Sequence, residues 1–471
     1  VLIYLSFLKI VHLCSSKLKA NSKGTQKMTS FNNGVKLTLM KRIHFILIFS
    51  IFLTNLNATE SVKSISKSPN KTEQEILQMI DMSKVTKYKE YHIPFQRNPN
   101  LSTLQYYFYR DLYKLNPSKG SVYYVEPSAT PYEFKFETIE DKKVKKQLKT
   151  KGILSYLYFE DDKIIIDEVS PKERFGKFFD NETKFRSNSM QKSLAGYVLG
   201  HAICEGYIDG IDTRINDWNL VEKTLYENHK LIDLLNMSSG DQKYADNSSI
   251  LFNGKYTGKN KIIDNAHLDN LLFNYFRKKK PSKKIYNYNV MNTKLILNYV
   301  LFKTGDDNFQ KLLDKVFREK AKTEDIVYFF SIDNNPQNGI ENMFYATRFD
   351  YLRIAKAIMD DYQNNTCVGK YLKEIYDRRI PKSINPNDDL KVEPEFNRTY
   401  SYGGQFHLDY PGLKDKIVFG MGGYGGKAIL IDVEDSRIVV LNSMHYNNDR
   451  YKYNHKKLLI DPIKYGKKSF K

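Results

Sequence analysis

Apolar residues near both ends of the chain follow short, strand-like patterns. Two such runs, 152–159 and 163–169, are separated by three acidic residues, and this arrangement predicts a β-hairpin. Four later apolar runs predict further strands, at 402–408, 417–420, 427–433 and 437–442. A C-terminal helix is indicated at 455–460.

Between these two strand-rich parts, from about residue 188 to 380, apolar residues recur at helical spacing. Helical patterns also precede the hairpin, at 73–82 and 104–115, after a polar, Ser- and Lys-rich linker at 59–75. Strands at both ends with helices between them predict an α+β protein. Its sheet would be assembled from both ends of the main domain.

Residues 40–58 have the pattern of a secretory signal peptide. The positively charged start at Met40 is followed by the apolar stretch 43–53 and a small-residue cleavage site. The apolar stretch is too short to span a bilayer comfortably. We therefore expect cleavage near Thr59, export to the periplasm or the medium, and no stable membrane span afterwards. Met40 is then a candidate true start, and an uncleaved N-terminal anchor is the alternative.

The net charge of +20 is spread along the chain. Its densest run, 277–280, has no accompanying nucleic-acid-binding motif, so we expect a solvated loop and no nucleic-acid partner. An anionic wall polymer or membrane surface is the alternative partner for this run. The cysteines at 14, 204 and 367 include no C-x-x-C pair and predict neither a disulfide framework nor a zinc site. Cys204 falls in a helical apolar pattern and is expected in the core.

The segment 185–206 carries the clearest chemistry. Asn188 is a good N-cap and Gly206 a good helix end, so Ser189 and Lys192 would lie one turn apart on the same side of a helix. A serine hydroxyl becomes an effective nucleophile when a neighbouring group takes its proton. A lysine can do so when burial and nearby cations lower its pKa. An S-x-x-K spacing alone is weak, because it occurs by chance in many chains.

The regions that follow this helix resemble the class C β-lactamase-related serine hydrolases, which include D,D-peptidases, esterases and aminohexanoate-dimer hydrolases. Residues 211–215 (I-D-T-R-I) are similar to the family's L-D-D-x-V, and residues 231–240 (L-I-D-L-L-N-M-S-S-G) to its I-R-H-L-L-T-M-T-S-G. The resemblance covers roughly residues 150–450. It implies an antiparallel sheet flanked by helices, a helical lobe, and an acyl-enzyme on Ser189 with Lys192 as its proton-transfer partner.

The family's second motif, Y-x-N or Y-x-S, adds a tyrosine to the proton relay. Tyr286 and Tyr288 are the two candidates. Counting back from Leu295, and from the helix end at Thr304, places Tyr288 in the motif's position. Val290 then stands where Asn or Ser is usual. Tyr286 is the alternative, and a further alternative is that both tyrosines only pack.

The family's third motif, K-T-G or H-x-G on a strand, resembles residues 419–427. Met421 stands where His or Lys is usual. After Gly423, the backbone N–H of Tyr424 would form an oxyanion hole with that of Ser189. A missing cation at position 421 disfavours substrates with a carboxylate there, which β-lactams and D-Ala-D-Ala peptides carry. The resemblance therefore favours an amidase or esterase.

Together these patterns predict an exported serine hydrolase that cleaves an amide or ester bond of a small-molecule or peptide-like substrate, without cofactor or metal. The alternatives are a penicillin-binding D,D-peptidase and an inactive binding relative, which Val290 and Met421 motivate. The hydrolase domain would span 121–471, after an upstream segment with signal peptide (1–58) and a linker with a helical extension (59–120). The expected catalytic residues are Ser189, Lys192 and Tyr288, and the expected oxyanion and substrate-binding residues are Tyr424, Gly423, Met421 and Tyr286.

Overall fold

The computed structural model of the protein describes residues 73–86, 99–114, 122–246, 249–252, 255–256, 268–331, 340–382, 399–444 and 450–470. The expected signal peptide lies outside the described residues, so cleavage near Thr59 stays a prediction. No helix within the described ranges is long and apolar enough to cross a membrane.

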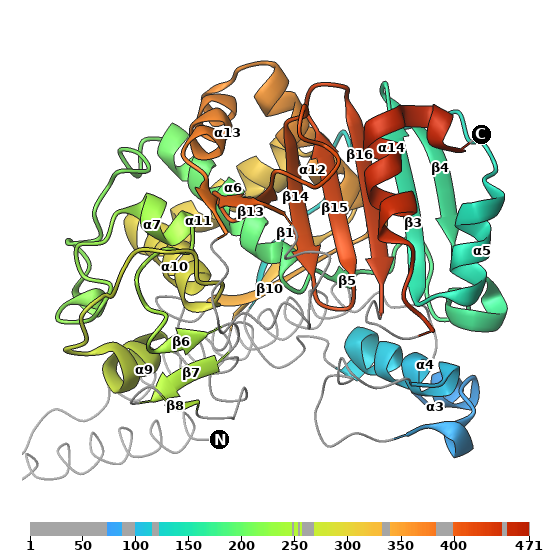
Figure 1. Ribbon diagram of the computed structural model, residues 1–471, viewed down its shortest axis with the longest axis horizontal. Coiled ribbons are helices and arrows are strands. Elements are labelled where there is room, and N and C mark those ends of the chain that lie inside the picture. The colour runs from blue at the N-terminus through green and yellow to red at the C-terminus, as the bar shows by residue number, and fades with distance from the viewer. Residues whose placement is uncertain are drawn as a thin grey trace, which may run out of the picture. The chain divides into compact units, whose positions relative to one another are not determined.

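The largest sheet has nine strands in the order β11-β12-β13-β14-β15-β16-β3-β4-β2 (Figure 1). Adjacent strands in this sheet are antiparallel, except that β2 runs parallel to β4. The strands are β2 (Lys135–Phe136), β3 (Ile153–Glu160), β4 (Lys163–Val169), β11 (Ile380–Pro381), β12 (Ser401–Gly403), β13 (Phe406–Leu408), β14 (Val418–Gly423), β15 (Lys427–Asp432) and β16 (Arg437–Ser443). Because β16 pairs with β3, both ends of the domain build this sheet, as predicted.

The turns of this sheet follow from residues that tolerate left-handed backbone. Asp161 (φ 50°) and Asp162 (φ 59°) close the predicted β3–β4 hairpin. The pattern at 402–408 predicted one strand, which was wrong. Gly404 (φ 60°) and Gln405 (φ 70°) turn the chain there, so β12 and β13 form a hairpin.

The described helices cover both faces of the sheet. They are α3 (Glu73–Gln78), α4 (Leu101–Tyr109), α5 (Lys142–Thr150), α6 (Met190–Cys204), α7 (Leu231–Leu235), α9 (Leu268–Leu271), α10 (Met291–Thr304), α11 (Asp306–Leu313), α12 (Arg348–Gln363), α13 (Cys367–Asp377) and α14 (Asp461–Tyr465). In the view of Figure 1, α14 lies in front of β16 and α12 behind it. The C-terminal helix expected at 455–460 begins with the turn Lys456–Ile460 and continues as α14.

Helix α6 is buried on nearly every side, which marks it as the central helix. Two glycines let neighbours approach it closely. A Cβ at Gly196 would lie 2.4 Å from the backbone oxygen of Gly404, and one at Gly200 would lie 2.5 Å from the Tyr371 ring. Gly206 (φ 78°) ends the helix, as predicted.

Strands also occur inside the region that the pattern predicted to be helical. A four-stranded sheet has the order β1-β9-β10-β5, and a three-stranded one has the order β6-β7-β8. Their strands are β1 (Val122–Val125), β5 (Phe185–Arg186), β6 (Ala245–Asp246), β7 (Ser249–Phe252), β8 (Lys255–Tyr256), β9 (Val327–Ser331) and β10 (Ile340–Ala346). Strands β6 to β10 lie within 188–380 and are too brief to be separated from the helical spacing in sequence, whereas β1 and β5 precede that region. The pairing of β5 with β10 sets the start of α6.

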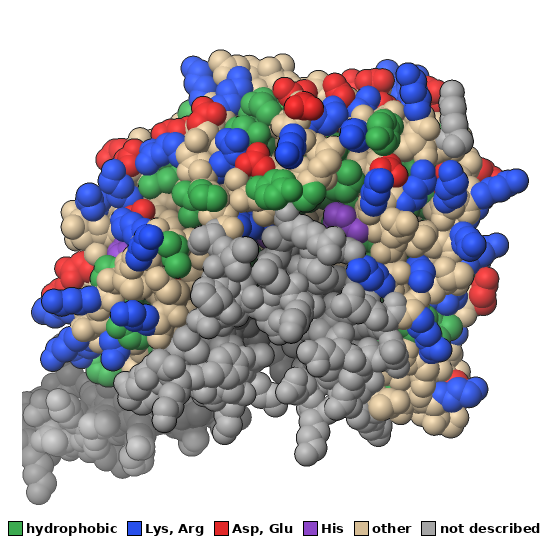
Figure 2. Space-filling view, viewed as in Figure 1, with side chains coloured by type: hydrophobic (Ala, Val, Ile, Leu, Met, Phe, Trp, Pro, Cys, Tyr) green, Lys and Arg blue, Asp and Glu red, His purple; other side chains and the backbone are tan. Residues whose placement is uncertain are grey.

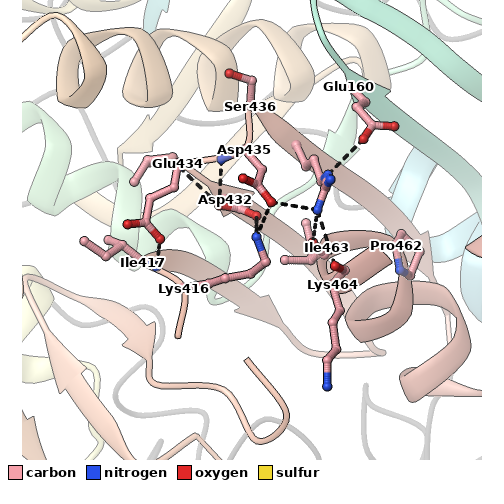
Figure 3. Close-up of polar contacts among 12 residues, drawn as sticks. Glu160, Lys416, Ile417, Asp432, Glu434, Asp435, Ser436, Pro462, Ile463 and Lys464 are labelled. Atoms are coloured by element: carbon pink, nitrogen blue, oxygen red, sulfur yellow. Dashed lines mark hydrogen bonds and ion pairs between the residues drawn. The ribbon is translucent and has the colours of Figure 1, made fainter. Parts of the chain in front are cut away.

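An ion-pair cluster closes the β15–β16 turn (Figure 3). Lys416 Nζ lies 2.9 Å from the carboxylate of Asp432, which is fully buried, and also contacts Asp435. The backbone N–H groups of Glu434 and Asp435 donate to Asp432 at 3.1 and 3.2 Å. This cluster stabilises the end of β15 that lies away from Lys427.

A disulfide joins Cys204, at the end of α6, to Cys367, at the start of α13. Their Cα atoms are 5.8 Å apart, although 163 residues separate them in sequence. The cysteine pattern predicted no disulfide framework, and the structure corrects this with one disulfide. Only the packing of α13 against α6 brings the two thiols together, and residue spacing does not reveal that contact.

Candidate active site

The backbone before α6 is held by neighbouring elements. The N–H of Ser187 donates to the backbone oxygen of Phe344 at 2.8 Å, and the hydroxyl of Ser187 accepts from the N–H of Phe344 at 3.1 Å. Asn188 has left-handed backbone (φ 49°), and its side-chain amide donates to the backbone oxygen of Tyr424 at 3.0 Å. Ser189 itself occupies the N-cap position, which was expected for Asn188. The left-handed backbone of Asn188 turns its side chain toward Tyr424 instead.

Ser189 and Lys192 lie on the same side of this first turn. Lys192 Nζ is 3.4 Å from Ser189 Oγ, and the backbone N–H of Lys192 donates to the oxygen of Ser189 at 3.0 Å. The Lys192 side chain is buried, whereas Ser189 keeps some exposure. The Nζ–Oγ distance is long for a hydrogen bond, as is common in enzymes without substrate. The amine of Lys192 is therefore within reach of the Ser189 hydroxyl.

Tyr288 is the tyrosine that contacts Lys192. The ammonium group of Lys192 lies 5.1 Å from the centroid of the Tyr288 ring, and the same ring stacks on the imidazole of His407 at 6.2 Å. Tyr286 packs instead against Tyr402, with ring centroids 5.1 Å apart, and is 2% exposed. Of the two expected tyrosines, the structure places Tyr288 beside the S-x-x-K pair.

A buried carboxylate holds the tyrosine segment in place. Asp241 is fully buried and accepts hydrogen bonds from the side-chain amides of Asn287 at 2.9 Å and Asn289 at 3.1 Å, and from the hydroxyl of Tyr226 at 2.8 Å. Burial raises the pKa of Asp241, and these hydrogen bonds oppose the shift. The sequence analysis did not predict this hydrogen-bonded group, which we call the Asp241 hub. The alternation Tyr-Asn-Tyr-Asn at 286–289 could have indicated that the asparagines share a buried acceptor.

The turn after β14 approaches the start of α6 closely. A Cβ at Gly423 would lie 2.6 Å from the backbone oxygen of Ser187, so only glycine fits there. Tyr424 follows in the turn and accepts the hydrogen bond from Asn188. Met421, on the same strand, is fully buried in the core cluster. Its side chain therefore faces the core, and the expected substrate contact is not supported by this placement.

A cluster of charged side chains lies next to the turn that follows β14. Lys427, which directly follows the turn, is 2% exposed; its Nζ donates to the backbone oxygen of Arg186 at 2.7 Å and lies 3.4 Å from a carboxylate oxygen of Asp111. Arg186 also lies 3.5 Å from Asp111. Burial lowers the pKa of Lys427, and the charge of Asp111 opposes this shift. Asp111 comes from Arg110–Lys114, the turn that continues α4.

His407 is a further neighbour that sequence reasoning missed. Lys382 Nζ lies 2.8 Å from His407 Nδ1. Burial, together with the positive charges of Lys382 and Lys192, lowers the pKa of His407 well below its usual range. The imidazole is therefore neutral, and Nδ1 accepts the hydrogen bond from Lys382. No sequence signal distinguished this histidine from the others in the chain.

No group of three or more His, Cys, Asp or Glu side chains that could hold a metal ion occurs within the described ranges. Val290, which replaces the usual Asn or Ser of the second motif, occupies the N-cap of α10 and packs in the core cluster. Ser189, Lys192 and Tyr288, which lie next to one another, are side chains that can exchange protons.

No protein-family model and no curated protein matches the chain. Among solved structures, a Bacillus anthracis protein named as a 6-aminohexanoate-dimer hydrolase aligns over 83% of this chain and 99% of its own, with a TM-score of 0.56 and 14% identity. A penicillin-binding protein from Bacillus halodurans aligns over 65% and 95%, with a TM-score of 0.46 and 15% identity. D-amino acid amidase from Ochrobactrum anthropi SV3 aligns over 64% and 90%, with a TM-score of 0.45 and 15% identity.

The last two TM-scores are lower, so the fold assignment rests on the Bacillus anthracis protein. That alignment covers nearly the whole of the neighbour. It agrees with the α+β architecture that the sequence resemblance implied. The chain therefore shares the fold of this solved structure.

Proposed function

We propose that the protein is an exported serine hydrolase that cleaves an amide or ester bond through an acyl-enzyme on Ser189. The observation that carries the proposal is the contact of Lys192 with both Ser189 Oγ and the Tyr288 ring, at the start of a buried helix. A hydroxyl, an amine and a phenol close together are the groups that such a reaction needs.

In the acylation step, Ser189 Oγ attacks the carbonyl carbon and its proton passes to Lys192, which must be neutral beforehand. The bond to the leaving amine or alcohol then breaks, and Lys192 with Tyr288 returns the proton to that group. Water hydrolyses the acyl-enzyme by the same route in reverse and regenerates the Ser189 hydroxyl. Each step balances with water as the only co-reactant.

The oxyanion would be held by the backbone N–H groups of Ser189 and Tyr424. The hydrogen bond from Asn188 to the Tyr424 oxygen supports this arrangement, because it ties the turn directly to the nucleophile segment. The close approach at Gly423 supports it further. The positive end of α6 adds a favourable field for the developing negative charge.

An amide or ester without a carboxylate near position 421 is the favoured substrate. Met421 is apolar and buried, so β14 offers no cation at that position. The Bacillus anthracis neighbour is named for an amide-cleaving activity, which fits an amidase or esterase. The second candidate, a penicillin-binding D,D-peptidase, would need such a cation from elsewhere.

Export is supported by two independent features. Residues 40–58 have the signal-peptide pattern, and Cys204 forms a disulfide with Cys367. Disulfides persist in oxidising compartments and are rare in reducing ones. Both features support a mature protein in the periplasm or the medium.

Activity-based labelling tests the proposal. The purified protein should react with a fluorophosphonate probe, and Ser189→Ala should abolish the labelling while leaving the circular dichroism spectrum unchanged. A panel of esters, short amides and a chromogenic cephalosporin then ranks substrates. Strong labelling by fluorescent penicillin would favour the D,D-peptidase. Failure of the folded wild-type protein to react with any probe would indicate an inactive binding relative.

A further inference from the structure

His407 lies on β13, between the strands β12 and β14 of the large sheet. Its neighbours in sequence, Phe406 and Leu408, are fully buried in the main core cluster. Successive side chains of a strand point to opposite faces, so the imidazole contacts a different group of residues. In the register of β12 and β13 it lies opposite Tyr402, with ring centroids 5.2 Å apart. Strand pairing on both sides therefore fixes the backbone that carries this imidazole.

The same imidazole contacts the tyrosine of the candidate active site. It stacks on the Tyr288 ring at an interplanar angle of 29°, with centroids 6.2 Å apart. Aromatic rings at such distances attract one another in offset-stacked arrangements. Tyr288 is half-buried, whereas His407 is 6% exposed. A buried ring therefore supports a partly exposed one, whose other neighbour is the ammonium group of Lys192 at 5.1 Å.

Lys382 holds the imidazole from another direction. Its Nζ donates to His407 Nδ1 at 2.8 Å and also contacts Thr399 Oγ1. The same ammonium group lies 5.7 Å from the centroid of the Tyr286 ring and 5.9 Å from that of Tyr402. On the face seen in Figure 2, Lys and Arg side chains are spread over the surface of the described residues. Lys382 is instead half-buried, and its charge is directed at aromatic rings and one imidazole.

The charges around His407 fix its protonation state. The groups that face it include Lys382, Lys192, Tyr288 and Tyr402. Burial and the two positive charges lower the pKa of His407, so the imidazole is neutral. Because Nδ1 accepts the hydrogen bond from Lys382, the ring proton is on Nε2. The imidazole therefore has one tautomer and one orientation, as a support for a neighbouring ring requires.

We propose that His407, held by Lys382, is a positioning residue that fixes the Tyr288 ring beside Lys192. The inference rests on the proposed function, because the place of this ring affects turnover only if the Tyr288 hydroxyl takes part in the proton relay. In this role His407 transfers no proton and Lys382 does not contact the substrate. A displacement of about 1 Å can lower an enzymatic rate by about 100-fold, so the loss of such a support is measurable.

A double-mutant cycle on kcat tests this role. The wild-type protein, His407→Ala, Tyr288→Phe and the double variant are assayed on an ester from the substrate panel. His407→Ala should lower kcat about tenfold and change KM less than about twofold. In the Tyr288→Phe protein, the same substitution should lower kcat less than about twofold, because the hydroxyl that it positions is already absent. Equal effects in both backgrounds would overturn the inference.

His201→Ala is the matched control. His201 is 5% exposed, lies on α6 about three turns beyond Ser189, and contacts the Tyr197 ring edge-on with centroids 4.7 Å apart. Its replacement removes a buried imidazole from a tyrosine outside the candidate active site, so kcat should not change. An equal fall of kcat in both alanine variants would show a general loosening of the fold and would contradict a specific role of His407.

Lys382→Met keeps the test decisive if His407→Ala does not fold. It removes the hydrogen bond to Nδ1 and leaves the imidazole, so kcat should fall about threefold. In nitrogen NMR spectra of the wild-type protein, His407 should stay neutral, with its proton on Nε2, where ordinary histidines titrate. In Lys382→Met its pKa should rise, because a neighbouring positive charge is lost. An ordinary titration of His407 in the wild-type protein would overturn the inference.

The positioning role and the proposed function fail in different ways. If the folded wild-type protein turns over no ester, or if Tyr288→Phe leaves kcat unchanged, the proton relay is wrong and the positioning role is wrong with it. If Tyr288→Phe lowers kcat and His407→Ala does not, only the positioning role is wrong. A rise of KM at unchanged kcat in Lys382→Met would assign this cation to substrate binding and would also overturn the inference.

Discussion

Two carboxylates support the candidate active site in opposite ways. Asp241, fully buried, accepts hydrogen bonds from neutral donors, among them the amides of Asn287 and Asn289 and the Tyr226 hydroxyl. Asp111 has a side chain 17% exposed and faces two cations, Lys427 and Arg186. The hydrogen bonds to Asp241 orient the segment that carries Tyr288. The carboxylate of Asp111 balances the positive charges next to the turn that carries Tyr424.

The difference shows why the two supports should respond to different conditions. Hydrogen bonds to Asp241 depend on geometry, and their loss leaves buried amides without an acceptor. The Asp111 cluster compensates a buried lysine, so its loss is an electrostatic penalty that pH can relieve. Asp111 also comes from the segment that continues α4, ahead of the strands of the main sheet. This part of the N-terminal extension therefore contributes to the support of the site.

The largest effect is expected from the tyrosine that the Asp241 hub places beside Lys192. Tyr288→Phe should lower kcat about 100-fold, because it removes a group from the proton relay. Tyr286→Phe is the matched control and should change kcat little, since Tyr286 packs against Tyr402. Steady-state kinetics on an ester from the substrate panel checks this. The reverse order would mean that Tyr286 serves the relay.

Asp241→Asn should lower the free energy of unfolding by about 2–4 kcal/mol, because an amide NH₂ replaces one carboxylate oxygen and the buried donors of Asn287 and Asn289 lose an acceptor. Urea denaturation measures the change.

Burial raises the pKa of Asp241, so the native state retains this proton to a higher pH than the unfolded chain does. Its contribution to stability is therefore greatest in acid and declines as pH rises through that pKa. A variant without this acid-range dependence would confirm the assignment.

Asp111→Asn should destabilise the protein by about 1–3 kcal/mol at neutral pH, since it leaves Lys427 and Arg186 less compensated. Burial already lowers the pKa of Lys427, and loss of Asp111 would lower it further. The deficit should therefore shrink as pH rises through the native pKa of Lys427, because the lysine then becomes neutral in both proteins. Denaturation at a series of alkaline pH values measures this.

The matched control for Asp111 is Asp212→Asn. Asp212 also contacts two cations, Lys230 at 2.8 Å and Arg378 at 2.7 Å, but its side chain is 53% exposed. Solvent screens this pair, so the control should cost little and should not show the same alkaline recovery. Equal losses in both variants would contradict a special role for the Asp111 cluster.

The smallest effect is expected from the hydrogen bond between Tyr453 and Gly426, which lies in the same turn as Tyr424. Tyr453→Phe removes the hydrogen bond to the Gly426 oxygen and should cost about 1 kcal/mol. The measurement is again urea denaturation, paired with the rate of fluorophosphonate labelling. A labelling rate that falls much more than stability would show that Tyr453, rather than Asp111, controls the turn.

Much of the fold followed from local patterns. The β3–β4 hairpin, the end of α6 at Gly206 and the late strands β14 to β16 were all visible as runs and turn residues. The β12–β13 hairpin was predicted as one strand, because the turn at Gly404 and Gln405 does not interrupt the apolar run. Strands β9 and β10 were missed, because brief strands inside helical spacing have no separate period. The motif resemblance supplied the expectation of an antiparallel sheet flanked by helices, with a helical lobe, which local pattern alone does not encode.

By itself, the sequence determined the proximity of Ser189 and Lys192, because residues one turn apart on a helix share a side. Only the tertiary structure decided which distant groups surround them. Asp111 and Lys427 are 316 residues apart in sequence, and Cys204 and Cys367 are 163 apart. Helical spacing is fixed by backbone geometry within a few residues. Contacts between distant segments depend on how the whole chain packs, and no local period records that.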